Sequence, residues 1–202
     1  MPGDAMTQPI FSIVRIVDPA GVPIPTSRIT NRKIQRSVYR VLTENVLCSM
    51  ASITAQGRAH INTAYFSYTP NLKVYFLSHP NAGHCQNILN NPSMALAIFS
   101  SNQTWGSPDR GLQLFGTCKA VARREAGQAD KLYGKRFAKY AAWKANLPSD
   151  SSGQDYRLYR FVTSELKVFD EKELGAGIFV VARMRRTATR ASVPKSNFGE
   201  TL

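Results

Sequence analysis

SMASITAQGRAHINTAYFSYTPNLKVYFLS, residues 49–78, decides the fold, because it contains three β-forming runs separated by two turn signals. The runs cover 46–54, 58–68 and 72–78, and the letters AQG and TPN between them are typical of tight turns. Short runs joined by such turns pair as antiparallel neighbours. This stretch therefore predicts a three-stranded antiparallel unit.

The third run alternates apolar and other residues with a period of two, as a half-buried strand does. Its predicted inner face carries Leu72, Val74, Phe76 and Ser78. The run 93–101, SMALAIFSS, is almost continuously apolar, which predicts a strand buried on both sides. Further strands are predicted at 111–122, where Gly116 indicates a bulge or a close backbone approach, at 156–170 as one segment or two, and at 177–183.

Helical periodicity marks three other segments. The first begins at Thr30 or Asn31 as N-cap and carries an apolar stripe of Ile34, Val38, Val41 and Leu42. A short helix is predicted around 82–90, before Asn91-Pro92. A longer helix is predicted from near Glu125, and its inner face consists of Ala129, Leu132, Tyr133, Phe137, Tyr140 and Ala141.

Six or seven strands with hairpin spacing, no βαβ repeat and only two substantial helices predict a mainly β fold, an antiparallel barrel with two or three packing helices. We divide the chain of 202 residues into an extended, proline-rich N-terminal arm (1–27), a barrel domain (28–183) and a basic C-terminal tail (184–202).

The formal net charge of +13 favours anionic or phosphorylated partners. Three cysteines, Cys48, Cys85 and Cys118, are too few for a disulfide framework and are predicted to be buried free thiols in a reducing compartment. The apolar run 10–17 contains Arg15 and is too short for a membrane span or a signal peptide. We therefore expect a cytoplasmic protein without a membrane partner.

Motifs for nucleotide-binding loops, zinc proteases and serine hydrolases are absent from the sequence, and His84-Cys85 alone cannot supply a tetrahedral metal site. We expect no metal. If the protein is an enzyme, the difficult chemistry is expected to belong to a cofactor.

Three segments follow one another in an order that resembles the FMN-binding split-barrel family of the pyridoxamine 5′-phosphate oxidase type. They are SMASITAQGRAHINTAYFSYTPNLKVYFLS (49–78), AGHCQNILNNPSMALAIF (82–99) and LQLFGTCKAV (112–121). The resemblance covers about residues 46–123. More distantly, LYGKRF (132–137) and LYRFVTSELKVFDEKELGAG (158–177) are similar to a poorly characterised bacterial branch of that superfamily. The resemblance implies a six- to seven-stranded antiparallel split β-barrel.

The resemblance also implies a homodimer with FMN in a groove between the subunits. Residues matching the strand that lies along the flavin ring are His60, Ile61, Asn62 and Thr63. Residues matching the phosphate seat are Leu77, Ser78, Gly83 and His84. Gln113 is placed either against a flavin carbonyl or on the surface of its strand.

Family members usually carry Lys or Arg at the positions matched by Gly83 and His84, and this sequence carries neither. A phosphate would favour protonated His84, which can then act as the cation, and Arg58 or an arginine of the partner subunit can also compensate. Alternatively, His84 is an ordinary first-turn residue and Ser78 caps a turn.

The favoured function is therefore FMN binding, as a flavin-dependent oxidoreductase that acts on an unknown small molecule; no catalytic residue is assigned. The alternatives are haem, with His60 or His84 as axial ligand, a deazaflavin, or a cofactor-free basic module that binds nucleic acid, which we consider the weaker hypothesis. Trp105 and Trp143 are interpreted as core or dimer-interface residues rather than walls of a ring pocket.

Overall fold

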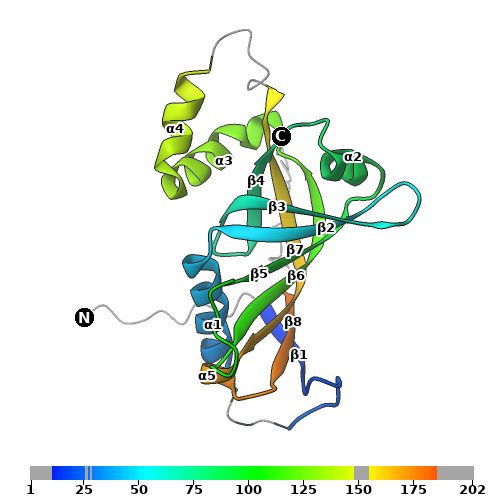
Figure 1. Cartoon of the computed structure of the whole chain (residues 1–202), viewed down its shortest axis with the longest axis vertical. Coiled ribbons are helices and arrows are strands. Elements are labelled where there is room, and N and C mark those ends of the chain that lie inside the picture. The colour runs from blue at the N-terminus through cyan, green and yellow to red at the C-terminus, as the bar shows by residue number, and fades with distance from the viewer. Residues whose placement is uncertain (1–10, 26, 28, 148–154, 186–202) are drawn as a thin grey trace, which may run out of the picture.

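The computed structural model describes residues 11–25, 27, 29–147 and 155–185 (Figure 1). Its strands are β1 (Phe11–Val17), β2 (Leu47–Ile53), β3 (Ala59–Tyr68), β4 (Lys73–Ser78), β5 (Ser93–Phe99), β6 (Arg110–Ala120), β7 (Arg157–Asp170) and β8 (Phe179–Met184). Its helices are α1 (Asn31–Glu44), α2 (Gly83–Asn90), α3 (Arg123–Arg136), α4 (Ala138–Ala145) and α5 (Glu171–Leu174).

A closed antiparallel barrel forms the centre of the molecule. Its strands follow the order β7-β4-β3-β2-β5-β6, and β6 pairs again with β7 to close the ring. The long strand β7 makes this possible, since one edge pairs with β6 while the other pairs first with β4 and then with β8. β1 extends the sheet beyond β8. The predicted mainly β, antiparallel barrel is confirmed.

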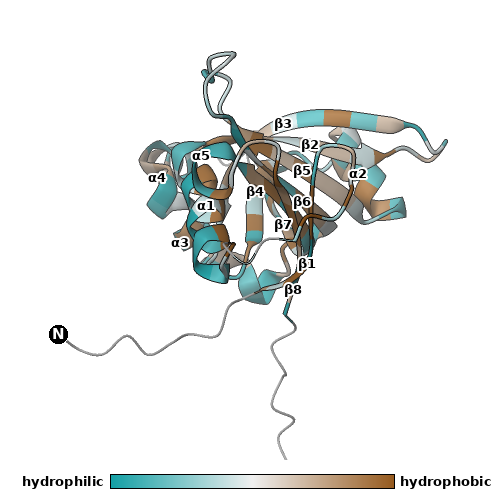
Figure 2. Ribbon diagram, turned by 90° about the horizontal axis from the view of Figure 1, so that it is seen from below, coloured by the Kyte–Doolittle hydropathy of each residue, from teal (hydrophilic) through white to brown (hydrophobic). Residues whose placement is uncertain are grey.

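The barrel interior is filled by alternate side chains of each strand, and the predicted inner face of β4 is confirmed because Leu72, Val74, Phe76 and Ser78 are all buried. α1 contacts β5, β6 and β7, and its predicted apolar stripe is fully buried. The side chain of Thr30 accepts a hydrogen bond from the Lys33 amide (3.3 Å), which confirms Thr30 as the N-cap. Figure 2 shows the hydrophobic positions along the central strands and the hydrophilic positions along the surrounding helices.

Two predictions about single elements are wrong. β5 is buried on one side only, because Met94, Leu96 and Ile98 point into the barrel while Ala95 and Ala97 lie on its half-exposed outer face. The helix predicted from near Glu125 is two helices, α3 and α4, separated at Phe137. The reason is tertiary: the Phe137 ring packs against Tyr65 and Tyr133, with centroids 5.6 and 4.8 Å away, and its backbone leaves the helical region (φ −123°, ψ 88°).

The bulge predicted at Gly116 is confirmed. The register of β6 and β7 shifts between Phe115 and Gly116, and a Cβ atom at Gly116 would lie 2.0 Å from the carbonyl oxygen of Val162. Only glycine permits this approach, which brings β6 close enough to β7 to close the barrel.

The flanking segments are described in part. Residues 11–17 of the arm (1–27) form β1, whose Phe11 is fully buried. Of the tail (184–202), residues 186–202 lie outside the described residues, as do 148–154. Cys48, Cys85 and Cys118 are free and buried, as predicted. Within the described segments, no helix combines the length and the apolar character that a membrane crossing requires.

Candidate functional site

The end of β4 and the start of α2 bring together Ser78 and His84, two residues of the predicted phosphate seat. The Ser78 hydroxyl oxygen lies 2.8 Å from Nε2 of His84, and both side chains are buried. Burial, and to a lesser extent the neighbouring His60, lower the pKa of His84 below 6.5. His84 is therefore neutral at pH 7 in the free protein rather than a standing cation.

His60 and Gly83 complete this cluster. A Cβ atom at Gly83 would lie 3.2 Å from Nε2 of His60, so a longer side chain at position 83 would press against the imidazole. The arrangement gives a physical reason for the absence of Lys or Arg at position 83, because His60 occupies the adjacent space. Nδ1 of His60 is buried and has no hydrogen-bond partner among the described residues.

The first turn of α2 offers main-chain donors beside the histidines. Ala82 is the N-cap and its side chain cannot accept a hydrogen bond. Within the described segments, the amides of Cys85 and Gln86 donate to the Ala82 carbonyl, whereas those of Gly83 and His84 donate to no main-chain carbonyl. Amides at a helix start, together with the helix dipole, suit an anion.

A second group of predicted residues lies on the outer face of the barrel. Ile61 and Gln113 line a shallow groove of about 160 Å³. The other lining residues are mostly small: Ser49, Ala51, Ala95, Leu96, Ala97 and Phe115. The small residues leave a flat floor between Ile61, which is 74% exposed, and Phe115, which is 38% exposed. A planar group can rest on such a floor.

β3 connects the two groups, because His60 faces α2 while the next residue, Ile61, faces the groove. Thr63 is also exposed on β3, and the Asn62 side chain donates to the Thr63 carbonyl oxygen (3.3 Å). Leu77 lies apart from both groups, since its side chain lines a different cavity beneath α3 and α4.

A side chain that braces α2 and a partner of Ser78 in the sheet lie beside this site. Asn87 of α2 donates to the Ser52 hydroxyl of β2 (3.0 Å) and so holds the helix over the barrel end. Arg157 of β7 pairs in register with Ser78. The separation of 79 positions between Ser78 and Arg157 leaves no local pattern from which this pairing could have been predicted.

The three histidines of the chain fit a haem iron poorly. Nε2 of His84 is hydrogen-bonded to the Ser78 hydroxyl. Nε2 of His60 faces Gly83, and Nδ1 of His60 is buried. Nδ1 of His79 accepts from the Asn81 amide (3.1 Å), and its Nε2 lies 3.7 Å from the Asp155 carboxylate. A haem iron requires an imidazole nitrogen that is free and directed into open space. The amides of α2 and the flat groove fit a phosphate ester with a planar ring better.

The comparisons with known proteins agree with this fold. The model of the family described as "Pyridoxamine 5′-phosphate oxidase" matches residues 34–169. No curated protein matches the chain.

Among solved structures, a protein of unknown function from Agrobacterium tumefaciens is similar with a TM-score of 0.56 and 18% identity over 72% of this chain. This chain spans 60% of the length of that protein. HutZ, the haem storage protein from Vibrio cholerae, has a TM-score of 0.54 and 19% identity, and the match covers 72% of this chain and 93% of HutZ. A third similar structure is a protein from Clostridium acetobutylicum related to general stress protein 26, of the pyridoxinephosphate oxidase family. Its TM-score is 0.54 at 12% identity, and the match covers 75% of this chain and 94% of that protein. At these identities the likeness concerns the fold.

Proposed function

The chain belongs to the pyridoxamine 5′-phosphate oxidase family, and from that premise we propose that it binds FMN and acts as a flavin-dependent oxidoreductase on a small molecule. One observation carries the proposal: β3 joins an anion seat at the start of α2 to a flat groove of small residues on the outer face.

In this proposal the free amides of Gly83 and His84 hold the phosphate, and Ser78 orients the His84 ring. The backbone of β3 from His60 to Thr63 lies along the flavin ring, and the amide of Gln113 reaches a flavin carbonyl. Bound FMN supplies the hydride chemistry. A phosphate beside His84 raises its lowered pKa, so that binding recruits a proton to the imidazole.

We further propose that the protein is a homodimer whose partner covers the groove. Large apolar side chains are exposed on the strands around it: Leu47 43%, Ile53 38%, Ile61 74%, Tyr65 56%, Phe99 51% and Phe115 38%. A second copy removes these side chains from water and encloses the flavin between the subunits. The three buried free thiols support a reducing, cytoplasmic location.

Haem is the second candidate cofactor, because HutZ, a haem storage protein, has the same fold. The ring nitrogens of the histidines are hydrogen-bonded or buried, which makes this chain a poorer fit for haem than for FMN. A deazaflavin is an alternative cofactor, because its ring is also planar. A function in nucleic-acid binding would give no role to the anion seat or to the groove.

A titration of the purified protein with FMN and with riboflavin tests the proposal, since riboflavin lacks only the phosphate. We expect the protein to quench FMN fluorescence with an affinity at least about tenfold higher than for riboflavin, because charge-assisted hydrogen bonds contribute about 1.5–3 kcal/mol. His84→Ala is expected to reduce the preference for FMN, and His84→Lys to preserve or increase it.

Asn81→Ala, in the loop before α2, serves as the control variant for disturbance of this loop and is expected to keep the preference. Failure of the wild-type protein to bind either flavin, or equal affinity for both in all variants, would overturn the proposed seat. Binding of haemin with a Soret shift, in the absence of flavin binding, would replace FMN with haem.

A further inference from the structure

A second cavity, which shares no lining residue with the groove, lies between the barrel and α3–α4. Its volume is about 500 Å³, within the range of small-molecule sites. The lining residues come from β4, β7 and the two helices: Leu77, Val121, Ala126, Asp130, Tyr140, Trp143, Lys144, Leu147, Tyr156, Arg157 and Leu158. The FMN proposal uses no cavity in this position, so the inference below is independent of it.

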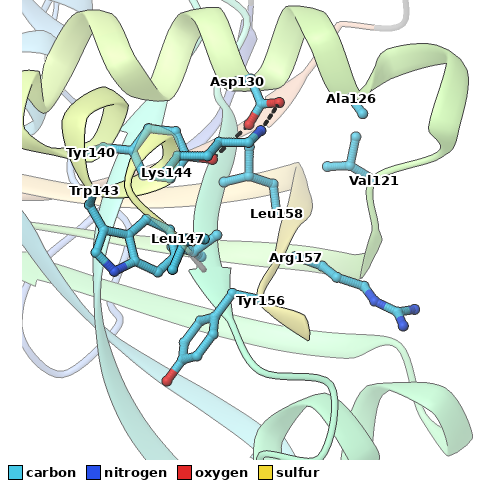
Figure 3. A pocket seen from close by; sticks show the side chains of 11 residues that line it. Val121, Ala126, Asp130, Tyr140, Trp143, Lys144, Leu147, Tyr156, Arg157 and Leu158 are labelled. Atoms are coloured by element: carbon cyan, nitrogen blue, oxygen red, sulfur yellow. Dashed lines mark hydrogen bonds and ion pairs between the residues drawn. The ribbon is translucent and has the colours of Figure 1, made fainter. Parts of the chain in front are cut away.

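The charges of the lining residues favour an anion. Lys144 is paired with Asp130, with 2.5 Å between Nζ and Oδ2, and the Tyr140 hydroxyl donates to the other carboxylate oxygen (2.6 Å; Figure 3). Burial and the Asp130 contact raise the pKa of Tyr140, so its hydroxyl stays protonated as a donor. Arg157 has no ion-pair partner among the described residues and leaves the lining with one net positive charge.

The walls favour a planar ring. Tyr140 stacks on Trp143 with centroids 5.9 Å apart, and Tyr156 lies edge-on to Trp143 at 6.0 Å. Figure 3 shows these three aromatic side chains at one end of the cavity and Val121, Ala126 and Arg157 at the other. Aromatic pairs prefer such stacked and edge-on arrangements, and an aromatic ligand can extend the same cluster.

The hydrogen-bonding groups in the cavity are mainly donors. Both oxygens of Asp130 are engaged, while the indole of Trp143 and the guanidinium of Arg157 can only donate. A ligand must therefore bring acceptors to this cavity. Arg matches a carboxylate with two parallel hydrogen bonds.

We propose that this cavity binds a planar aromatic carboxylate, with the ring among Tyr140, Trp143 and Tyr156 and the carboxylate against Arg157. Leu77 and Leu158 of adjacent strands form the apolar floor beneath the ring.

Calorimetric titration of the full chain with 2-naphthoate and with its neutral analogue 2-naphthamide tests the proposal. We expect saturable binding of naphthoate, at least tenfold tighter than that of the amide. Arg157→Gln is expected to weaken naphthoate binding at least tenfold and to leave the amide unchanged. Trp143→Leu is expected to weaken both.

Lys172→Gln, on α5, removes one exposed positive charge far from the cavity and is the matched control, expected to bind like the wild type. Circular dichroism verifies that each variant is folded. The proposal is overturned if the wild-type protein binds neither probe at millimolar concentration, or if Arg157→Gln and Lys172→Gln have equal effects. The titration with naphthoate contains no flavin, so the proposal for this cavity does not depend on the result of the FMN titration.

Discussion

His84 shows how one buried side chain sets a property that composition does not reveal. Its imidazole is 5% exposed and is bonded to Ser78, while a second imidazole, His60, lies close by. Removing water from a histidine disfavours its charged form, so a residue that reads as a cation in the sequence is neutral in the folded free protein.

This environment predicts an acid-sensitive stability. Because the pKa of His84 is lowered in the fold, the unfolded chain binds the proton first as the pH falls below 6.5. The contribution of neutral His84 is therefore present above pH 6.5 and is lost between pH 6.5 and the folded pKa. Urea unfolding is expected to show a free energy that falls by at most about 1.4 kcal/mol per pH unit in that interval.

His84→Gln is expected to show a smaller fall over the same interval, which serves as the control. Glu125 and Glu173 also have lowered pKa values, chiefly through hydrogen bonds from Arg160 and Arg40. Their contributions are lost only as the pH falls below 4.5, so they do not change between pH 7.5 and 5.5, and the comparison with His84→Gln assigns the difference in slope to His84. Equal slopes for both proteins would contradict the argument.

At the scale of elements, the pairing of β6 with β7 closes the barrel and depends on Gly116. The carbonyl of Val162 occupies the place that a side chain would need. The extra residue is Ser164 of β7, which has no partner in β6, so Phe161 and Thr163 before it and Leu166 and Val168 after it all face the core.

Gly116→Ala is expected to destabilise the protein by about 3 kcal/mol, at the upper end of the cost of overpacking, because backbone and not a flexible side chain must move. Urea unfolding measures this change. Gly127→Ala is the matched control: Gly127 lies within α3 with nothing within 4 Å of the added Cβ, and alanine there is expected to stabilise by about 0.5–1 kcal/mol. A neutral Gly116→Ala would disprove the close approach.

At the scale of the whole molecule, helices pack at both barrel ends and on the β3–β4–β7 side, whereas β2, β5 and β6 keep apolar side chains on the outer surface. Exposed apolar side chains in this number mark an interaction surface, which we assign to a second copy.

Ile61→Glu is expected to convert the proposed dimer into a monomer, because the charge would be buried at the centre of the contact without a partner. Light scattering after size exclusion reports the mass. Val22→Glu introduces the same charge at a similarly exposed apolar residue elsewhere and is expected to leave the dimer intact. A monomeric wild type, or a dimeric Ile61→Glu variant, would remove the shared groove from the FMN proposal.

Much of the element order was predictable, because periodicity and turn residues act over a few neighbours. The predicted runs 46–54, 58–68 and 72–78 correspond to β2, β3 and β4, and no predicted end differs from the observed end by more than one residue. The break at Phe137 was not predictable, since it depends on a ring of β3 that lies 72 positions earlier. Trp105 is 98% exposed and therefore is not a core residue, and its alternative placement in a dimer interface stays a prediction. Trp143 lines a cavity.

The sequence alone determined the strands of the barrel, the Thr30 cap of α1 and the bulge glycine, because each depends on local backbone chemistry. Only the tertiary structure decided that His60 lies against Gly83, that Arg157 pairs with Ser78 in the sheet and that α3 and α4 cover a cavity lined by aromatic side chains. These contacts join residues tens of positions apart, and only the closure of the barrel brings them together.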